Sequence, residues 1–385
     1  MQHRIIVLGA GYAGAITAGR LAKRLRREDV SITLVNASPE FVERVRNHQV
    51  AAGGSVKPRP LTAMFADTGV ALRIASVTAV DVSRKTVSLT DGELSYDTLV
   101  YALGSAANGT PEHAYELAGR PGAQRLRERL ATLSRNDTVL VVGGGLTGIE
   151  AVTEIAEARP DLDVAVATRG AFGDWLSPKG RAHLRKVTNR LGIAVHENVA
   201  VDRVGAGHVE LADGRTLPAA VTVWTGGFAV HPLAAATSLE LGPDGRIVVD
   251  GTMRSVSHPD VYAVGDSALA MGAGDKAMRM ACASGVPQAW QAADSIAARL
   301  TGGKLPNAPL KYFNQCISLG RGDGLIQFVT EDDVSRPGVV TGRAAAIYKE
   351  MVVKGAYWGV ANPMLRLPVR RRAVTREPAA VSTMD

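Results

Sequence analysis

Two glycine-rich hexapeptides, GAGYAG at residues 9–14 and GGGLTG at residues 143–148, carry the clearest chemical signal in this chain. Each follows an aliphatic run typical of a buried strand and opens a segment with helical spacing. Glycines so placed allow a tight turn, let backbone N–H groups approach a pyrophosphate, and let helix and strand pack closely. The helix N-terminus adds partial positive charge for the phosphates. Two such turns predict two bound dinucleotides, most simply a flavin and a nicotinamide nucleotide.

The next strand of each unit is expected to end at a side chain that binds a ribose. Asn36 and Ala37 take this place in the first unit, where asparagine can form hydrogen bonds but brings no charge. Thr168 and Arg169 take it in the second unit. An acid there would repel a 2′-phosphate, whereas Arg169 can pair with one, so we expect NADPH to be used at least as well as NADH. The alternative is a solvated loop arginine.

A distant run, VYAVGD, ends in Gly265 and Asp266 and completes the pattern of the first unit. With it, the chain resembles the two-dinucleotide-binding-domain flavoproteins of the pyridine nucleotide-dependent oxidoreductase superfamily. The resemblance implies that Asp266 holds the ribityl chain of FAD. The segment Ala102-Leu103-Gly104 stands where the superfamily has an Ala-Thr-Gly crossing between domains, and departs from it at Leu103. Gly226 lies in a corresponding second crossing.

The resemblance implies an α/β fold with two Rossmann-like dinucleotide-binding domains, for FAD and NAD(P), plus a smaller C-terminal α+β region. We expect a discontinuous FAD-binding domain in residues 1–110 and 245–305, an NAD(P)H-binding domain in 111–244, and the C-terminal region in 306–385. The length of 385 residues, the 46% hydrophobic content and the 41 glycines fit several α/β units with many tight turns.

The second turn extends to GGGLTGIE, which is similar to the Gly-Gly-Gly-x-Thr-Gly-x-Glu pattern of type II NADH dehydrogenases and related quinone reductases, including the ferroptosis-suppressor (AIF-like) branch. In those enzymes the glutamate lies between nicotinamide and flavin, so Glu150 is the first candidate for a catalytic carboxylate. The alternative is an acid favoured only by the helix dipole. His48 is the second catalytic candidate, as an acid–base group or flavin neighbour. Its alternative is a solvated helix face.

Further cofactor contacts follow from the same resemblance. Arg44 and Arg46 are candidates for contact with FAD, and Val77 matches a strand position whose backbone touches adenine. Pro287 and Gln288 stand where a helix begins beside the flavin pyrimidine edge, and Pro287 suits a first helical turn. The expected dinucleotide-binding residues are Gly9, Gly11, Tyr12, Ala13, Gly14, Asn36, Ala37, Arg44, Val77, Ala102, Leu103, Gly104, Gly143, Gly145, Leu146, Thr147, Thr168, Arg169, Gly226, Gly265, Asp266, Pro287 and Gln288.

Cysteine spacing narrows the choice within the superfamily. The chain has two cysteines, Cys282 and Cys316, and no Cys-x-x-Cys or Cys-x-x-x-x-Cys pair. It therefore cannot use the redox dithiol of thioredoxin-reductase-like or lipoamide-dehydrogenase-like members. A pair formed in space, which a sulfide–quinone reductase would favour, is one alternative, but two small buried hydrophobic side chains are the preferred interpretation. No metal site is expected.

Residues 341–358 have the spacing of an amphipathic helix, with Ile347 and Met351 on an apolar face and Lys349 and Glu350 on the other. In type II dehydrogenases the C-terminal region helps to form the quinone site and attaches the enzyme to the membrane surface. Amphipathic helices usually bury their stripe against their own protein, so we expect packing on the chain's own core, with a homodimer or a peripheral membrane contact as alternatives.

Net charge and hydropathy restrict the partners. The net charge of +7 permits nucleic-acid binding, but the arginines are scattered and no aromatic residue interleaves them, so nucleic acid is not favoured. The basic segment 370–372 could instead attract anionic lipid. No apolar run reaches the roughly 20 residues that span a bilayer, and no signal-peptide pattern precedes the first strand. We expect a cytoplasmic chain that could lie on the inner face of the membrane.

The sequence thus predicts an FAD-dependent NAD(P)H oxidoreductase. Hydride would pass from NAD(P)H to FAD, and two electrons would then pass to an acceptor, with a quinone as the first candidate. One alternative is a flavin-dependent oxidase or reductase that acts on a specialised metabolite or an electron-carrier protein. Another is an AIF-like, flavin-stabilised nucleic-acid-binding protein with low turnover.

Overall fold

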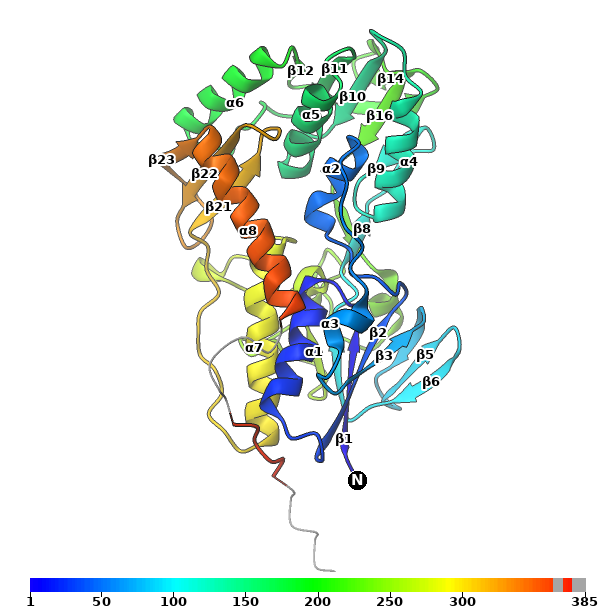
Figure 1. The fold of residues 1–385 in the computed structure, drawn as a ribbon, viewed down its shortest axis with the longest axis vertical. Helices are drawn as coiled ribbons and strands as arrows, with labels where there is room; N and C mark the ends of the chain where they lie inside the picture. The colour runs from blue at the N-terminus through cyan, green and yellow to red at the C-terminus, as the bar shows by residue number, and fades with distance from the viewer. Residues whose placement is uncertain (363–369, 376–385) are drawn as a thin grey trace, which may run out of the picture.

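The computed structural model describes residues 1–362 and 370–375, which form two lobes with a C-terminal region alongside them (Figure 1). Each lobe is built around a five-stranded parallel sheet. The α/β class with two Rossmann-like units, predicted from the sequence, is therefore confirmed, while the exact domain boundaries stay a prediction.

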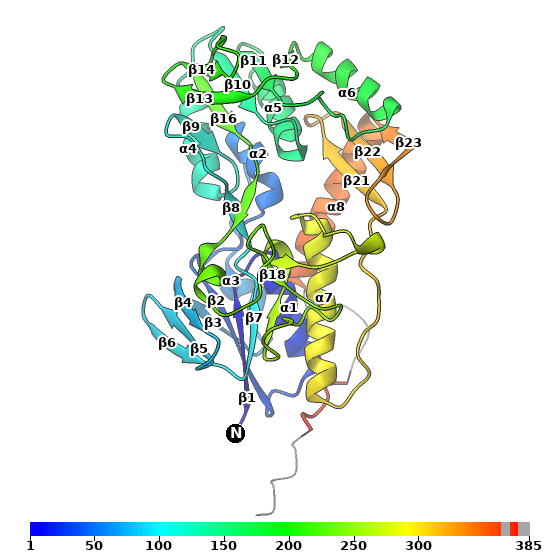
Figure 2. The ribbon, with the colours of Figure 1, turned by 180° about the vertical axis from the view of Figure 1, so that it is seen from behind.

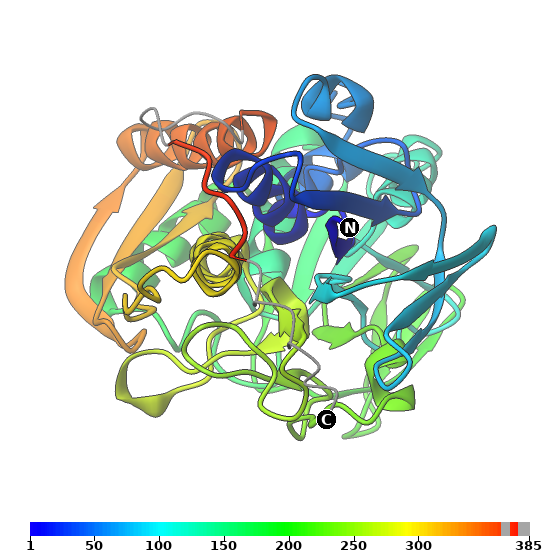
Figure 3. The same cartoon turned by 90° about the horizontal axis from the view of Figure 1, so that it is seen from below.

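The first lobe contains the first glycine turn. Its sheet has the order β19-β7-β1-β2-β3. Helices α1 and α7, which are far apart in the sequence, pack side by side beside this sheet (Figures 1 and 3). The elements are β1 His3–Leu8, α1 Tyr12–Arg24, β2 Val30–Asn36, α3 Leu61–Phe65, β3 Val70–Ile74, β7 Thr98–Tyr101, β18 Ile247–Val248, β19 Val261–Ala263, β20 Ala268–Leu269, α7 Cys282–Leu300, and an antiparallel sheet of β4 Val77–Asp81, β5 Thr86–Leu89 and β6 Gly92–Ser95.

The second lobe contains the second glycine turn, and its sheet has the order β12-β11-β10-β16-β9. A two-stranded ribbon of β8 Ser105–Ala107 and β17 Phe228–Val230 runs between the lobes (Figure 2). The elements of the second lobe are β9 Ala114–Glu116, α4 Arg120–Ala131, β10 Thr138–Val142, α5 Leu146–Ala158, β11 Asp163–Ala167, α6 Pro178–Arg190, β12 Ala194–His196, β16 Val221–Trp224, and an antiparallel sheet of β13 Val201–Gly205, β14 His208–Leu211 and β15 Thr216–Pro218.

A short segment near the N-terminus crosses to the second lobe. It comprises the 3-10 helix η1 Arg44–Arg46 and helix α2 Asn47–Ala51. Helix α2 packs against α4 and α5 of the second lobe (Figure 1). The side chains of Val50 and Ala51 accordingly belong to the hydrophobic core of that lobe. This crossing brings His48 next to the helix that follows the second glycine turn.

The C-terminal region is an antiparallel sheet covered by one long helix. The sheet contains β21 Asn314–Ser318, β22 Gly324–Val329 and β23 Ser335–Thr341, and the helix is α8 Arg343–Ala361. Helix α8 contacts α1 of the first lobe as well as β21 and β22 (Figure 1). Residues 370–375, which include the basic segment 370–372, run beside the first lobe, where the Arg372 N–H donates to the Arg24 carbonyl and the Thr375 N–H to the Leu300 carbonyl.

The orientation of α8 contradicts the expectation that its apolar stripe packs on the chain's own core. Ile347, Met351 and Trp358 are 54%, 64% and 53% exposed, respectively. Lys349 and Glu350, expected on the solvent side, instead form ion pairs with other parts of the protein. The stripe faces outward because Lys349 and Glu350 have their partners on the inner side of the helix. None of the helices in the described ranges has the length and apolar character needed to cross a bilayer.

Candidate functional site

The first glycine turn connects β1 to α1, and its outer glycines are required by close backbone packing. Gly9 has φ +93°, and a β-carbon there would lie 2.4 Å from the Ala102 carbonyl oxygen. A β-carbon on Gly14 would lie 1.9 Å from the Gly9 carbonyl oxygen. At Gly11, by contrast, an added β-carbon would meet no atom within 4 Å. The middle glycine therefore faces open space, as expected where backbone approaches a ligand.

The second glycine turn, between β10 and α5, repeats this arrangement. Gly143 has φ +120°, and a β-carbon there would lie 2.6 Å from the Thr225 Oγ1 atom. A β-carbon on Gly148 would lie 1.8 Å from the Gly143 carbonyl oxygen, whereas one on Gly145 would meet nothing within 4 Å. Two unrelated stretches of sequence thus produce the same cradle, once in each lobe.

The helices that follow the turns begin with no capping side chain. Gly11 caps α1 and Gly145 caps α5, and neither can supply a side-chain hydrogen bond to the first N–H groups. Those groups are free to donate to phosphate oxygens, and the helix dipoles favour an anion there. The two turns therefore fit the pyrophosphates of FAD and of a nicotinamide nucleotide.

The candidate ribose-binding residues differ in whether their side chains are already hydrogen-bonded within the protein. The Asn36 Oδ1 atom accepts from the Ala10 N–H at 2.9 Å, and its Nδ2 atom donates to the Ser38 carbonyl at 2.8 Å. Asn36 therefore ties the end of β2 to the glycine turn. In the second lobe, Thr168 packs against the turn, and Arg169 is exposed beyond β11. An exposed guanidinium at this edge is accessible to a ligand.

Segments far apart in the sequence meet at Asp266. Its Oδ2 atom accepts from the Ser105 hydroxyl at 2.6 Å and lies 3.8 Å from the Arg44 guanidinium. The preceding Gly265, with φ +71°, donates its N–H to the Gln288 Oε1 atom at 2.7 Å. The expected positions after β7, after β19 and in α7 thus form one connected site in the first lobe. Gln288 contributes by holding the Gly265 turn.

Two expectations for the flavin side need correction. Pro287 does not stand in the first turn of a helix, because α7 already begins at Cys282 and encloses the proline. The first free N–H groups of α7 therefore precede Pro287. Arg46 is not available for FAD, since its guanidinium lies 3.1 Å from the Glu43 carboxylate and 2.9 Å from Glu350. Arg44 remains as the arginine beside Asp266.

A buried charged cluster lies where three parts of the chain meet. The Glu150 Oε1 atom of α5 lies 2.9 Å from the Lys349 Nζ atom of α8 and accepts from the Ser318 N–H at 3.0 Å. The Glu150 Oε2 atom lies 3.8 Å from the His48 Nδ1 atom of α2. Lys349 also donates to the Cys316 carbonyl at 3.0 Å. The second lobe, the crossing segment and the C-terminal region are joined at this point.

The charges of the cluster follow from its burial and its pairing. Burial disfavours the Glu150 carboxylate, but Lys349, His48 and the Ser318 N–H together keep its pKa below the usual value. Burial likewise disfavours the Lys349 ammonium, but Glu150 raises its pKa. At neutral pH the pair is therefore ionised.

His48 is 5% exposed, so the alternative of a solvated helix face is wrong. Burial lowers the pKa of His48 to about 4, so that the ring is neutral at physiological pH. Its Nε2 atom has no hydrogen-bond partner among the described residues. The cluster therefore combines an ion pair with one neutral imidazole nitrogen that is still able to bond a ligand or a water molecule.

Lys349 and Ser105 are the site residues that sequence reasoning missed. The spacing placed Lys349 on the solvent side of an amphipathic helix, and no local pattern indicates a partner on α5. Ser105 follows the Ala102-Leu103-Gly104 crossing directly. Its position could have identified it as a partner of Asp266, because the crossing itself was expected to lie near that aspartate.

The two cysteines are not joined in a disulfide. Both Cys282 and Cys316 are free and partly buried. Burial raises the pKa of each thiol, which disfavours the thiolate form that redox chemistry requires. No group of potential metal ligands was found within residues 1–362 and 370–375.

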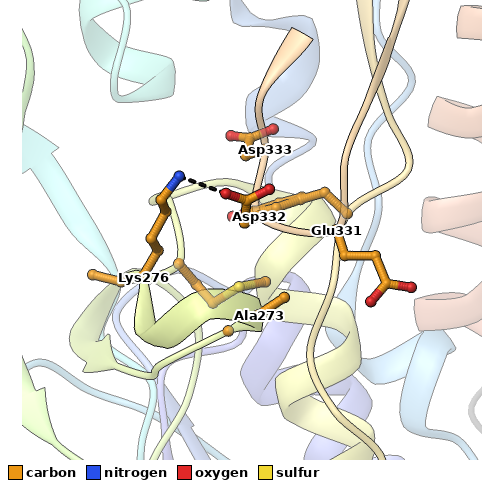
Figure 4. Close-up of a pocket in the computed structure, with 9 residues that line it drawn as sticks. Ala273, Lys276, Glu331, Asp332 and Asp333 are labelled. Atoms are coloured by element: carbon orange, nitrogen blue, oxygen red, sulfur yellow. Dashed lines mark hydrogen bonds and ion pairs between the residues drawn. The ribbon is translucent and has the colours of Figure 1, made fainter. Parts of the chain in front are cut away.

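A cavity of about 210 Å³ lies apart from the glycine turns, between the 3-10 helix near Ala273 and the loop that follows β22 (Figure 4). Asp332 at its rim pairs with Lys276 at 2.6 Å, and Glu331 pairs with Lys311 at 2.8 Å. These carboxylates are already neutralised, so the cavity adds nothing to the dinucleotide sites.

Comparison with known proteins agrees with this geometry. Residues 3–297 match the family described as pyridine nucleotide-disulphide oxidoreductase. An NADH dehydrogenase-like protein of Mycobacterium tuberculosis is 32% identical over 311 residues, which cover 74% of this chain and 77% of that protein. The type II NADH:quinone oxidoreductase of Staphylococcus haemolyticus is 26% identical over 392 residues, covering 91% and 94%. The sulfide:quinone oxidoreductase of Aquifex aeolicus has a similar fold, with a TM-score of 0.80 at 19% identity over 97% and 98% of the chains.

The contrasting surroundings of Gly11 and Gly14 generate a first prediction. Gly14→Ala should destabilise the protein by about 1–3 kcal/mol or more, because its methyl group collides with backbone that cannot move away. Gly11→Ala should fold normally but bind less FAD, because its methyl group enters the ligand's space. Thermal unfolding and the flavin absorbance per protein distinguish the two effects. A Gly14→Ala variant with full stability and full flavin content would contradict the packing argument.

The Glu150–Lys349 pair generates a second prediction. Glu150→Gln leaves a buried ammonium without its counter-charge and should destabilise the protein by roughly 3–5 kcal/mol. The double variant Glu150→Gln/Lys349→Met removes both charges and should recover part of that loss. Thermal unfolding of the wild type, both single variants and the double variant measures the coupling. Strictly additive losses would mean that the pair does not act as a unit.

Proposed function

The chain belongs to the pyridine nucleotide-disulphide oxidoreductase family, and we propose that it oxidises NAD(P)H and reduces a quinone. It is an NAD(P)H-dependent flavin oxidoreductase of the type II NADH dehydrogenase kind, with FAD as cofactor and NADH as co-substrate. FAD, when bound, supplies the chemistry that accepts a hydride and returns two electrons to an acceptor. The protein supplies binding, orientation and local charge.

The observation that carries the proposal is the position of Glu150 relative to the second glycine turn. The turn opens α5, and Glu150 lies one helical turn further along, in the buried cluster. The N–H groups at the start of α5 would hold the nicotinamide nucleotide by its pyrophosphate, which places the rest of that ligand near the carboxylate. In the first lobe, Asp266 and the start of α1 would hold FAD.

A quinone suits the charges of this cluster. Its two carbonyl oxygens gain electrons and protons on reduction, so a site for it needs hydrogen-bond donors and a source of protons. Lys349 keeps its ammonium at neutral pH, and the Nε2 atom of His48 has no partner in the part of the chain that the structure describes. Support also comes from the Staphylococcus haemolyticus relative, whose name identifies a quinone as its acceptor.

The outward stripe of α8 supports a peripheral position on the inner face of the membrane. Ile347, Met351 and Trp358 lie on the same helix as Lys349 and point away from the protein. Side chains of this kind can insert into the boundary between lipid headgroups and acyl chains. A helix that touches lipid on one side and the buried cluster on the other would give a membrane-dissolved quinone a short way to the site.

Half-reactions measured without oxygen provide a third prediction. Both NADPH and NADH should bleach the flavin, and Arg169 should make kcat/KM for NADPH at least equal to that for NADH. The reduced enzyme should then be reoxidised by a soluble quinone about tenfold or more faster than by oxygen or by an electron-carrier protein. Stopped-flow absorbance of the flavin follows both steps.

The comparison of acceptors is the decisive part of this experiment. If an iron–sulfur protein reoxidises the flavin quickly and a quinone does so slowly, the acceptor is an electron-carrier protein and not a quinone. A strong preference for NADH would contradict only the role proposed for Arg169. Bleaching by neither nucleotide would contradict the proposed function as a whole.

The stripe generates a fourth prediction. Met351→Glu should reduce sedimentation with anionic liposomes several-fold, because it places a charge at the lipid interface. Val256→Glu is the matched control, since Val256 is an exposed apolar residue that lies between β18 and β19 and not on α8. Analytical ultracentrifugation of the same samples without lipid tests the alternative occupant. A wild-type dimer that Met351→Glu dissociates, with no liposome binding, would assign the stripe to a second copy of the chain.

A further inference from the structure

Three glutamates follow one another along a single face of α5. Glu150, Glu154 and Glu157 are separated by four and three residues, which places their side chains on one side of an α-helix. The row begins at the buried cluster with Glu150 and ends at the surface, where Glu157 is exposed. Glu154 lies between them and is only 6% exposed. The row therefore connects the interior with solvent.

The turn at residues 318–321 contacts all three carboxylates. The Ser318 N–H, at the end of β21, donates to Glu150 at 3.0 Å. Three residues later, the Arg321 Nε atom lies 3.9 Å from the Glu154 Oε1 atom. The backbone N–H of the same Arg321 donates to the Glu157 Oε2 atom. The three carboxylates thus face the segment 318–321 together, and they line one boundary between the second lobe and the C-terminal region.

Glu154 is the unusual member of the row. Its Oε2 atom is buried and has no hydrogen-bond partner among the described residues. Burial raises the pKa of Glu154 to about 7, with Glu157 and Glu150 acting in the same direction and Arg321 opposing them. A carboxyl group in this state takes up and releases a proton readily near neutral pH. A purely structural glutamate would be expected to use both oxygens in hydrogen bonds.

We propose that Glu157, Glu154 and Glu150 form a path that carries a proton from solvent to the Glu150–Lys349 cluster during quinone reduction. The inference rests on the function proposed above. Reduction of a quinone Q follows NAD(P)H + H⁺ + Q → NAD(P)⁺ + QH₂, in which the hydride supplies both electrons and one of the two protons. The second proton must come from solvent. Glu157 takes it up and Glu154 passes it inward to Glu150. Glu150 then gives it to an oxygen of the reduced quinone beside Lys349 and returns to its ionised state.

The charged and titratable groups around this path come from α5, from the turn after β21 and from the buried cluster. Glu154 faces its two neighbours on α5 and the Arg321 guanidinium from the turn after β21. At the inner end, the groups around Glu150 are His48 from α2, Lys349 from α8, Cys316 from β21 and Cys282 from α7. His48 is neutral, while Glu150 and Lys349 are charged, so the cluster keeps the same charge near pH 7, whereas the raised pKa of Glu154 lies in that range.

The test is Glu154→Gln in the FAD-loaded enzyme, assayed with two acceptors. A soluble quinone needs the solvent proton, whereas ferricyanide accepts electrons without any proton. The quinone rate should fall about tenfold or more, while the ferricyanide rate should stay within about twofold of the wild type. The wild-type quinone rate should also fall as the pH rises through about 7, where Glu154 loses its proton. The variant should lack this dependence.

Control variants separate proton transfer from packing. Glu154→Asp keeps a titratable carboxyl group and should restore part of the quinone rate. Glu128→Gln removes an exposed carboxylate on α4, away from the path, and should change neither rate. Glu157→Gln changes the surface end of the path, and it replaces Glu154→Gln in the test if that variant does not fold. It should lower the quinone rate selectively.

Three outcomes would overturn the proposal. Equal losses with both acceptors would assign Glu154 a structural role. A wild-type quinone rate and an unchanged pH profile in Glu154→Gln would eliminate the path while leaving the proposed function intact. A wild-type enzyme that reduces ferricyanide but no quinone would contradict the proposed function, and the path with it.

Discussion

The buried ion pair between Glu150 and Lys349 determines how the C-terminal helix lies on the rest of the molecule. A buried carboxylate left without a partner would cost several kcal/mol, so Lys349 must point inward. Residues two positions away on an α-helix are rotated by about 200° and must point outward. Ile347 and Met351 occupy those positions, which explains why α8 exposes its apolar stripe. One electrostatic requirement thus fixes the buried cluster and the outer surface at once.

The parts of the fold that follow from local sterics could be predicted from the sequence. At Gly14 and Gly148 an added β-carbon would lie within about 2 Å of a carbonyl oxygen, so only glycine fits. This requirement makes the glycine pattern recognisable in the sequence. The aliphatic runs before these glycines predicted the central strands for a similar reason. Buried parallel strands need apolar residues on both faces.

The parts that depend on distant partners could not be predicted in this way. His48 is polar and lies in a short helix, and only the crossing of α2 to the other lobe buries it. Helical periodicity placed Ile347 and Met351 on one side of α8 but could not tell that this side faces outward, while Lys349 faces inward together with the buried Val353 and Val360. Pro287 misled for another reason. A proline often marks a first helical turn, yet α7 begins upstream and continues through it.

Because the buried cluster is shared between α5 and α8, the C-terminal region cannot be exchanged independently of the two lobes. A chimaera that grafted a foreign C-terminal region onto these two lobes would have to import a cation at the place of Lys349, and a side chain to meet Arg46 at the place of Glu350. Without the cation, the buried Glu150 carboxylate would lose its counter-charge, and without the partner for Arg46 that guanidinium would keep its ion pair with Glu43 but lose the one with Glu350. Helices α5 and α8 would therefore have to be exchanged together, although they lie far apart in the sequence.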